Sequence, residues 1–225
     1  MNETLSRTAI VFGASGLVGR FLTEELAHDA RYSSVTVFVR KEISTFPKNV
    51  RQVTFNPESI QEVTDKIIAD HVYCCIGTTR KKAGSNEKFY KTDHDLVERI
   101  AQAASINKAS AFIVVSSIGA SAESGNFYLK TKGQMENSIR TFNFSNLSIL
   151  RPSVLLGIRH ESRFGEEIGK KLAIILTPVL VGKIRKYRPI HAAAVAKAMV
   201  SCAFKGKGEF VLESDEIEKL SQNTN

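Results

Sequence analysis

The chain has 225 residues, of which 43% are hydrophobic and 24% are charged. This composition is ordinary for a globular protein and excludes a fibrous or low-complexity one. The net charge is +8, which favours an anionic partner: a nucleic acid, a membrane surface or an anionic cofactor. Because the chain has no tryptophan and no basic strand interleaved with aromatic residues, we expect no nucleic-acid partner.

The cysteines and the apolar runs indicate the redox environment of the protein and whether it spans a membrane. Cys74 and Cys75 are adjacent in a predicted buried strand, and Cys202 lies in a predicted helix, so neither a disulfide framework nor a metal site is expected. The first residues carry no secretory signal, and we predict a reduced, cytoplasmic location. The longest apolar run, residues 172–181, is half of the ~20 residues that a membrane span requires and contains Pro178. No integral membrane segment is therefore expected.

The first element predicts a phosphate-binding turn. An apolar run at 9–12 is followed by Gly13, Gly16 and Gly19, and then by the apolar stripe of a helix. A strand, a glycine turn and a helix N-terminus direct free N–H groups and the positive end of the helix dipole at an anion. We assign the sharp turn to Gly13, close approach of the pyrophosphate to Gly16, and close helix packing to Gly19. The sequence thus predicts a dinucleotide site.

The end of the second strand predicts which dinucleotide is bound. Residues 34–40 are a β-branched run that is typical of a buried parallel strand, and it ends at Arg40 and Lys41. An acidic residue at this place accepts hydrogen bonds from the ribose of NAD, whereas an arginine accommodates the 2′-phosphate of NADP. The sequence therefore favours NADP(H).

Strands and helices then alternate along the chain, which predicts an α/β fold of the Rossmann type with a doubly wound parallel sheet. The strand at 70–77 should bring Ile76, Gly77 and Thr78 over the cofactor. We predict one domain over 1–225, with residues 158–225 forming a small substrate-side lobe. Further strands are expected at 50–55, 111–116, 146–157 and 209–213, and helices at 59–69, 87–104, 192–204 and 215–220.

Tyr128 and Lys132 form a YxxxK pair at the start of a predicted helix, where a spacing of four puts both on one face. A free tyrosine has a pKa near 10, and a nearby ammonium favours the phenolate. The tyrosine can then exchange a proton with a substrate carbonyl oxygen, and the lysine can also bond the nicotinamide ribose. Ser116 and Ser117 end the preceding strand, and their side chains should face opposite sides. We prefer Ser117, nearer the strand end, for stabilising the same oxygen.

The chain resembles short-chain dehydrogenase/reductases of the atypical, extended-like kind and, more narrowly, the Tat-interactive-protein family of NADPH-binding proteins. The resemblance rests on GASGLVGR, VFVRK, CIGTTRKKAG, SSIGAS, YLKTKGQME and LRPSVLLGIRHESR, which together span most of residues 8–200. It implies that Tyr128 is the proton acceptor. The implied cofactor contacts are Ser15, Gly16, Leu17, Val18, Arg40, Lys41, Ile76, Gly77, Tyr128, Lys132, Leu155 and Arg163. The interval from serine to tyrosine is shorter than in typical members.

The leading hypothesis is an NADP(H)-dependent oxidoreductase that acts on a small-molecule carbonyl or alcohol. Its alternatives are a cofactor-sensing binding protein with little turnover and, from the charge alone, a nucleic-acid-associated regulator. Residues 164–186 have two interpretations: a buried helix that covers the substrate pocket, or an apolar element that touches a membrane or a second subunit. A homodimer is left open.

Overall fold

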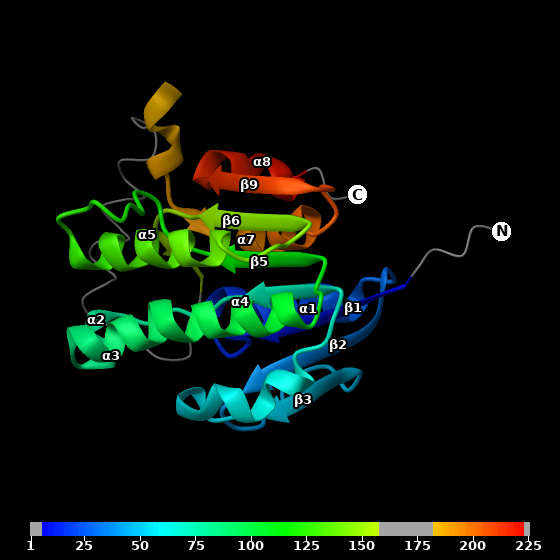
Figure 1. The fold of residues 1–225 in the computed structure, drawn as a ribbon. Coiled ribbons are helices and arrows are strands. Elements are labelled where there is room, and N and C mark those ends of the chain that lie inside the picture. The colour runs from blue at the N-terminus through cyan, green and yellow to red at the C-terminus, as the bar shows by residue number, and fades with distance from the viewer. Residues whose placement is uncertain (1–5, 158–181, 223–225) are drawn as a thin grey trace.

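The computed structural model describes residues 6–157 and 182–222. Its main element is a seven-stranded sheet in the order β3-β2-β1-β4-β5-β6-β9, in which every pairing is parallel (Figure 1). Helices separate most of the strands in the chain; β3 follows β2 directly, and the short β7 follows β6 and pairs with β8. The predicted doubly wound Rossmann-type fold is confirmed. The strands are β1 (Arg7–Phe12), β2 (Tyr32–Val39), β3 (Val50–Thr54), β4 (His71–Cys74), β5 (Ala111–Val115), β6 (Asn146–Arg151), β7 (Leu155–Leu156), β8 (Ile190–His191) and β9 (Gly208–Glu213).

Helices cover both faces of the sheet because the side chains of each strand alternate between two apolar cores (Figure 1). Ala9 and Val11 of β1 pack on one face with α1 and α7, whereas Ile10 and Phe12 pack on the other with α4 and α5. The helices are α1 (Leu17–His28), η1 (Pro57–Lys66), α2 (Arg80–Ala83), α3 (Asn86–Tyr90), η2 (Lys91–Asp95), α4 (Leu96–Ile106), α5 (Phe127–Arg140), η4 (Gly182–Tyr187), α7 (Ala192–Cys202) and α8 (Ser214–Gln222).

The strand order reverses between β1 and β4. The chain passes outward from β1 through β2 to β3, and then returns to the other side of β1 to form β4. In open α/β sheets, ligands bind beyond the carboxyl ends of the strands at such a reversal. The glycine turn after β1 and the segment after β4 meet at this place.

Two predicted helices differ from the observed ones. The helix expected at 87–104 is interrupted by η2, a π-helical turn over Lys91–Asp95. The helix expected at 59–69 is a 3₁₀ helix over Pro57–Lys66 with a kink at Ser59. Apolar spacing does not separate these helix types, because residues spaced by three or four share one face in each of them over a turn or two.

The chain after β6 returns to the main sheet. Pro152 follows β6, so the strand expected to reach Gly157 ends early, and Leu155–Leu156 pair separately with β8. β9 pairs with β6, and α7 packs on the face that α1 covers. The substrate-side lobe over 158–225 remains a prediction. Among the described helices, none has the length and apolarity that crossing a membrane requires.

Candidate functional site

The glycine turn fits tightly against the end of β4. Gly13 has φ +76°, and a Cβ on it would lie 2.6 Å from the carbonyl carbon of Cys75. A Cβ on Gly19 would lie 2.2 Å from the carbonyl oxygen of Gly13, so α1 starts directly on the turn. Both positions therefore exclude any larger residue.

Helix α1 presents its N-terminus to the space above the turn. Its N-cap residue is Gly16, which is exposed and makes no side-chain cap. Ser15 is exposed and Leu17 is half-buried, whereas the side chain of Val18 is buried in the core. Val18 can therefore meet a cofactor only through its backbone. The first turn contains no acidic side chain, so the dipole is free to favour an anion.

Arg40 and Lys41 follow β2 directly, and both are exposed. Since β2 is the parallel neighbour of β1, the two strands end at the same edge of the sheet. The basic pair thus follows the strand next to the glycine turn, as the sequence predicts for a 2′-phosphate site.

The segment after β4 lies between the glycine turn and helix α5. A Cβ on Gly77 would lie 3.6 Å from Oδ1 of Asp93 and 3.8 Å from Nζ of Lys132, which are ordinary contact distances. The N–H of Thr78 donates to Oδ2 of Asp93 at 2.9 Å. Gly77 and Thr78 therefore lie directly against a buried pair of opposite charges.

Lys132 and Asp93 form this pair, with 2.8 Å between Nζ and Oδ1 and side chains that are 4% and 0% exposed. Burial opposes the charge of the ammonium, but the carboxylate of Asp93 favours it, and the net result is a raised pKa of Lys132. Tyr128 and Cys74 contribute in the same direction. Lys132 is thus a charged group held beneath the expected cofactor position.

Tyr128 lies in the first turn of α5, one turn before Lys132. The side chain of Asn126 begins the helix by accepting the N–H of Tyr128 at 2.9 Å. The half-buried ring of Tyr128 is tilted against Phe89, with 5.7 Å between ring centroids. The helix cap therefore positions the backbone of Tyr128, and Phe89 packs against its ring.

The two serines after β5 have different surroundings. Ser116 is buried, and its hydroxyl donates to Oε1 of Glu136 at 2.5 Å. Glu136 also accepts two hydrogen bonds from Arg151 of β6. Ser117 is half-buried and donates weakly to the carbonyl oxygen of Ile118 at 3.4 Å. Ser116 is therefore part of the packing of α5, and Ser117 stays the candidate for the site.

The segment around Leu155 lies near the start of α1. Leu155 and Leu17 each pack against the same apolar core, and a Cβ on Gly157, directly after β7, would lie 2.9 Å from the side chain of Leu17. The chain that leaves β7 therefore passes the start of α1. Arg163 and the run at 172–181 lie outside the described residues.

Sequence reasoning missed three residues that shape the site. Asp93 holds Lys132, Glu136 anchors α5, and a Cβ on Gly133 would lie 2.2 Å from the backbone of the loop before α5. A signal existed for Asp93, because it continues the apolar stripe of Phe89, Leu96 and Ile100. An acidic residue on such a stripe requires a buried partner.

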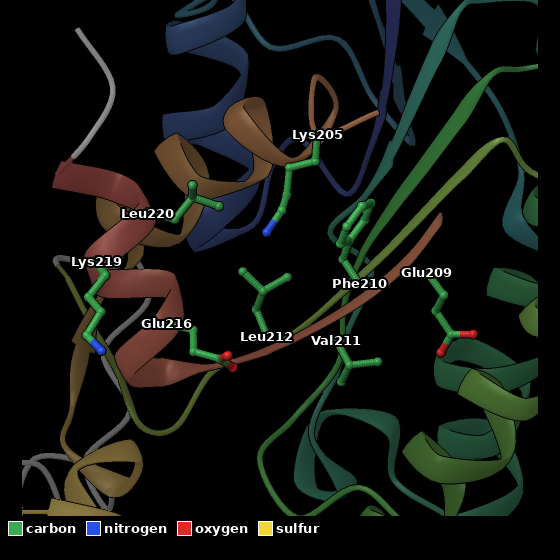
Figure 2. Close-up of a pocket in the computed structure, with 8 residues that line it drawn as sticks. All are labelled: Lys205, Glu209, Phe210, Val211, Leu212, Glu216, Lys219 and Leu220. Atoms are coloured by element: carbon green, nitrogen blue, oxygen red, sulfur yellow. The ribbon is translucent and has the colours of Figure 1, made fainter. Parts of the chain in front are cut away.

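A separate open cavity lies beside the outer strand β9 (Figure 2). Lys205, Phe210 and Leu212 line it on one side and Glu216 and Leu220 of α8 on the other. None of its lining residues comes from the glycine turn, β4 or α5. It is therefore distinct from the candidate site.

Solved structures of nucleotide-sugar enzymes share this fold. A structure described as MoeE5 in complex with UDP-glucose and NAD has a TM-score of 0.68 and 16% identity, and covers 96% of this chain and 82% of its own. An ADP-L-glycero-D-manno-heptose-6-epimerase from Helicobacter pylori has a TM-score of 0.68 and 17% identity, with 99% and 84% covered. At these identities the likeness extends to the fold alone.

Curated relatives are closer in sequence. The protein HTATIP2 of Rattus norvegicus is 35% identical over 171 residues, which are 74% of this chain and 70% of that protein. The mitochondrial protein FMP52 of Candida albicans is 32% identical over 231 residues, covering 97% of this chain and all of that protein. FMP52 of Saccharomyces cerevisiae is 31% identical, with 93% and 94% covered.

These relatives correct one prediction and confirm another. The predicted cytoplasmic location is wrong, because the yeast relatives are named as mitochondrial proteins. The resemblance to the Tat-interactive-protein family is confirmed by the rat protein. A family model described as NAD(P)H-binding matches residues 13–205. The chain therefore belongs to the NAD(P)H-binding family, within the group of relatives of HTATIP2 and FMP52.

Proposed function

We propose that this chain is an NADP(H)-dependent oxidoreductase that transfers hydride between the nicotinamide and a carbonyl or alcohol. The observation that carries the proposal is the buried ammonium of Lys132. Lys132 lies one helical turn from Tyr128, and its Nζ would be 3.8 Å from a Cβ on Gly77. A charged group is costly to bury, and active sites are where such groups are commonly kept.

The cofactor would be held at the reversal of the strand order. Gly13 would shape the turn, its bond from the N–H of Gly16 at 2.9 Å would close it, and the exposed backbone at Ser15 and Gly16 would let the pyrophosphate reach the first free N–H groups of α1. Arg40 would bind the 2′-phosphate with two hydrogen bonds, whereas an aspartate in its place would repel the phosphate. The remaining contacts proposed are Leu17, Val18, Gly19, Lys41, Ile76, Gly77, Thr78, Leu155 and Arg163.

NADPH, when bound, supplies the hydride. Tyr128 would give a proton to the carbonyl oxygen of the substrate, with Lys132 stabilising the phenolate that remains. Ser117 would donate a hydrogen bond to the same oxygen as its negative charge develops. In the reverse direction Tyr128 would take the proton from an alcohol.

The test is NADPH oxidation with a panel of aldehydes, ketones and quinones. Tyr128→Phe should lower kcat at least about 100-fold for any compound that is reduced, since it removes the proton donor. Tyr90→Phe is the matched control, because the ring of Tyr90 stacks on His94, whereas the ring of Tyr128 packs against Phe89. Its kcat should equal that of the wild type.

The alternative, a cofactor-sensing binding protein, predicts another outcome of the same experiment. NADPH would bind tightly, and no compound would show turnover that depends on Tyr128. That result would reject the enzyme and leave the NAD(P)H-binding family assignment unaffected.

A further inference from the structure

Asp93 is a buried carboxylate that the proposed reaction does not yet use. It lies in the π-helical turn η2, between α3 and α4, and its side chain is fully buried. Such turns insert one extra residue into a helix and occur frequently at functional sites. The turn therefore introduces an acidic side chain into a helix that otherwise packs with apolar residues.

The two carboxylate oxygens of Asp93 have different partners. Oδ2 accepts the N–H of Thr78 at 2.9 Å, which fixes the carboxylate to the segment after β4. Oδ1 lies 2.8 Å from Nζ of Lys132, and no donor in the described part of the chain makes a hydrogen bond of good geometry to it. Lys132 is therefore held from one side, by a carboxylate that is itself held by the backbone.

We propose that Asp93 is a positioning residue that keeps the Lys132 ammonium charged and directed at the carboxyl end of β4. This inference rests on the proposed function and names a further residue of the same site. Asp93 acts through Lys132, and none of its contacts requires it to touch substrate or cofactor.

The charges around Lys132 decide what removing Asp93 does. The titratable groups that face the ammonium are Asp93 from η2, Tyr128 from α5 and Cys74 from β4. Burial raises the pKa of Cys74 to about 11, so its thiol is neutral near pH 7. Asp93 is the carboxylate of the set. Without it, burial dominates, and Lys132 should lose its proton at a lower pH.

The test compares Asp93→Asn with Asp95→Asn across pH. Asp95 lies in the same π-helical turn, but its carboxylate faces Nδ1 of His94 at 2.9 Å, so its variant controls for loss of an acid from this turn. NADPH affinity of the full chain is measured by fluorescence from pH 6 to pH 9.5. The Asp93→Asn variant should match the wild type at pH 6 and bind NADPH about tenfold more weakly at the alkaline end, because neutral Lys132 loses its charged hydrogen bond to the nicotinamide ribose. The control should follow the wild type throughout.

Two results would overturn the proposal. One is an Asp93→Asn variant that follows the wild type at every pH. The other is a loss of affinity that is the same at every pH, which a merely structural role would produce. Neither depends on turnover: if no carbonyl is reduced by the wild type, the proposed function fails while these curves still decide the role of Asp93.

A second measurement covers an Asp93→Asn chain that does not fold. Lysines of the wild-type protein are labelled with ¹³C at Cε and titrated by NMR, and the Lys132 signal is assigned by its loss in Lys132→Met. The Lys132 signal should remain that of an ammonium beyond the pH at which the exposed lysines titrate. Titration of Lys132 earlier than the exposed lysines would contradict the proposal.

Discussion

Replacing Gly13 by alanine tests the geometry of the glycine turn. A left-handed backbone costs an alanine roughly 1–2 kcal/mol. The new Cβ would also lie 2.6 Å from the carbonyl carbon of Cys75 and 2.9 Å from the nitrogen of Ile76, closer than carbon atoms approach. The end of β4 must then move, and overpacking of this kind costs about 1–3 kcal/mol. The free energy of unfolding should therefore fall by about 2–5 kcal/mol.

Urea denaturation measures this loss as a lower transition midpoint with an unchanged slope. Gly125→Ala is the matched control, because a Cβ there has no neighbour within 4 Å and the backbone is not left-handed. The control should lie within about 0.5 kcal/mol of the wild type. A Gly13→Ala protein as stable as the control would refute the reasoning about the turn.

Three further predictions concern other parts of the molecule. Arg40→Asp should weaken NADPH binding about tenfold or more and leave NADH binding unchanged, as measured by fluorescence titration; equal losses for both cofactors would contradict the 2′-phosphate assignment. Glu136→Gln should lower the free energy of unfolding in urea by about 3–5 kcal/mol, because the guanidinium of Arg151 loses its buried counter-charge; a loss below about 1 kcal/mol would show that α5 is not anchored there. Burial lowers the pKa of His71 to about 4, against 6.5 for an ordinary histidine, so on acidification the histidine of the unfolded chain is protonated before that of the folded chain. The contribution of His71 to the free energy of unfolding is therefore complete above pH 6.5 and should fall by up to about 3 kcal/mol by pH 4. Urea unfolding across this range should show a smaller decline in His71→Gln, and an equal decline would assign it to other groups.

Local patterns were sufficient to predict most of the fold. The apolar run before Gly13 and the β-branched run before Arg40 are β1 and β2, since central parallel strands are buried on both faces and leave a continuous signal. Two helical stripes also identified α1 and α7. The alternation of strands and helices predicted a doubly wound parallel sheet, whereas the strand order comes from the structure.

The parts that could not be predicted depend on contacts between distant residues. The position of Asp93 on an apolar stripe indicates a buried partner, but Lys132 is 39 positions away and no pattern in the sequence identifies it as that partner. Glu136 meets Arg151 only because α5 packs beside β6. Ser116 and Ser117 could not be separated by alternation, because that rule gives opposite faces without saying which face holds the site. The buried Glu136 on one of these faces distinguishes them.

Deuterium transfer tests the proposed reaction most directly. NADPH that carries deuterium on the transferred position of C4 is mixed with the carbonyl compound that the wild type reduces fastest, and the product is examined by mass spectrometry. The wild type and Tyr90→Phe should each place one deuterium on the former carbonyl carbon, and Tyr128→Phe should form at least about 100-fold less of this product in the same time. Tight NADPH binding with no deuterium in any product, or equal labelling by Tyr128→Phe, would contradict hydride transfer with Tyr128 as the proton donor.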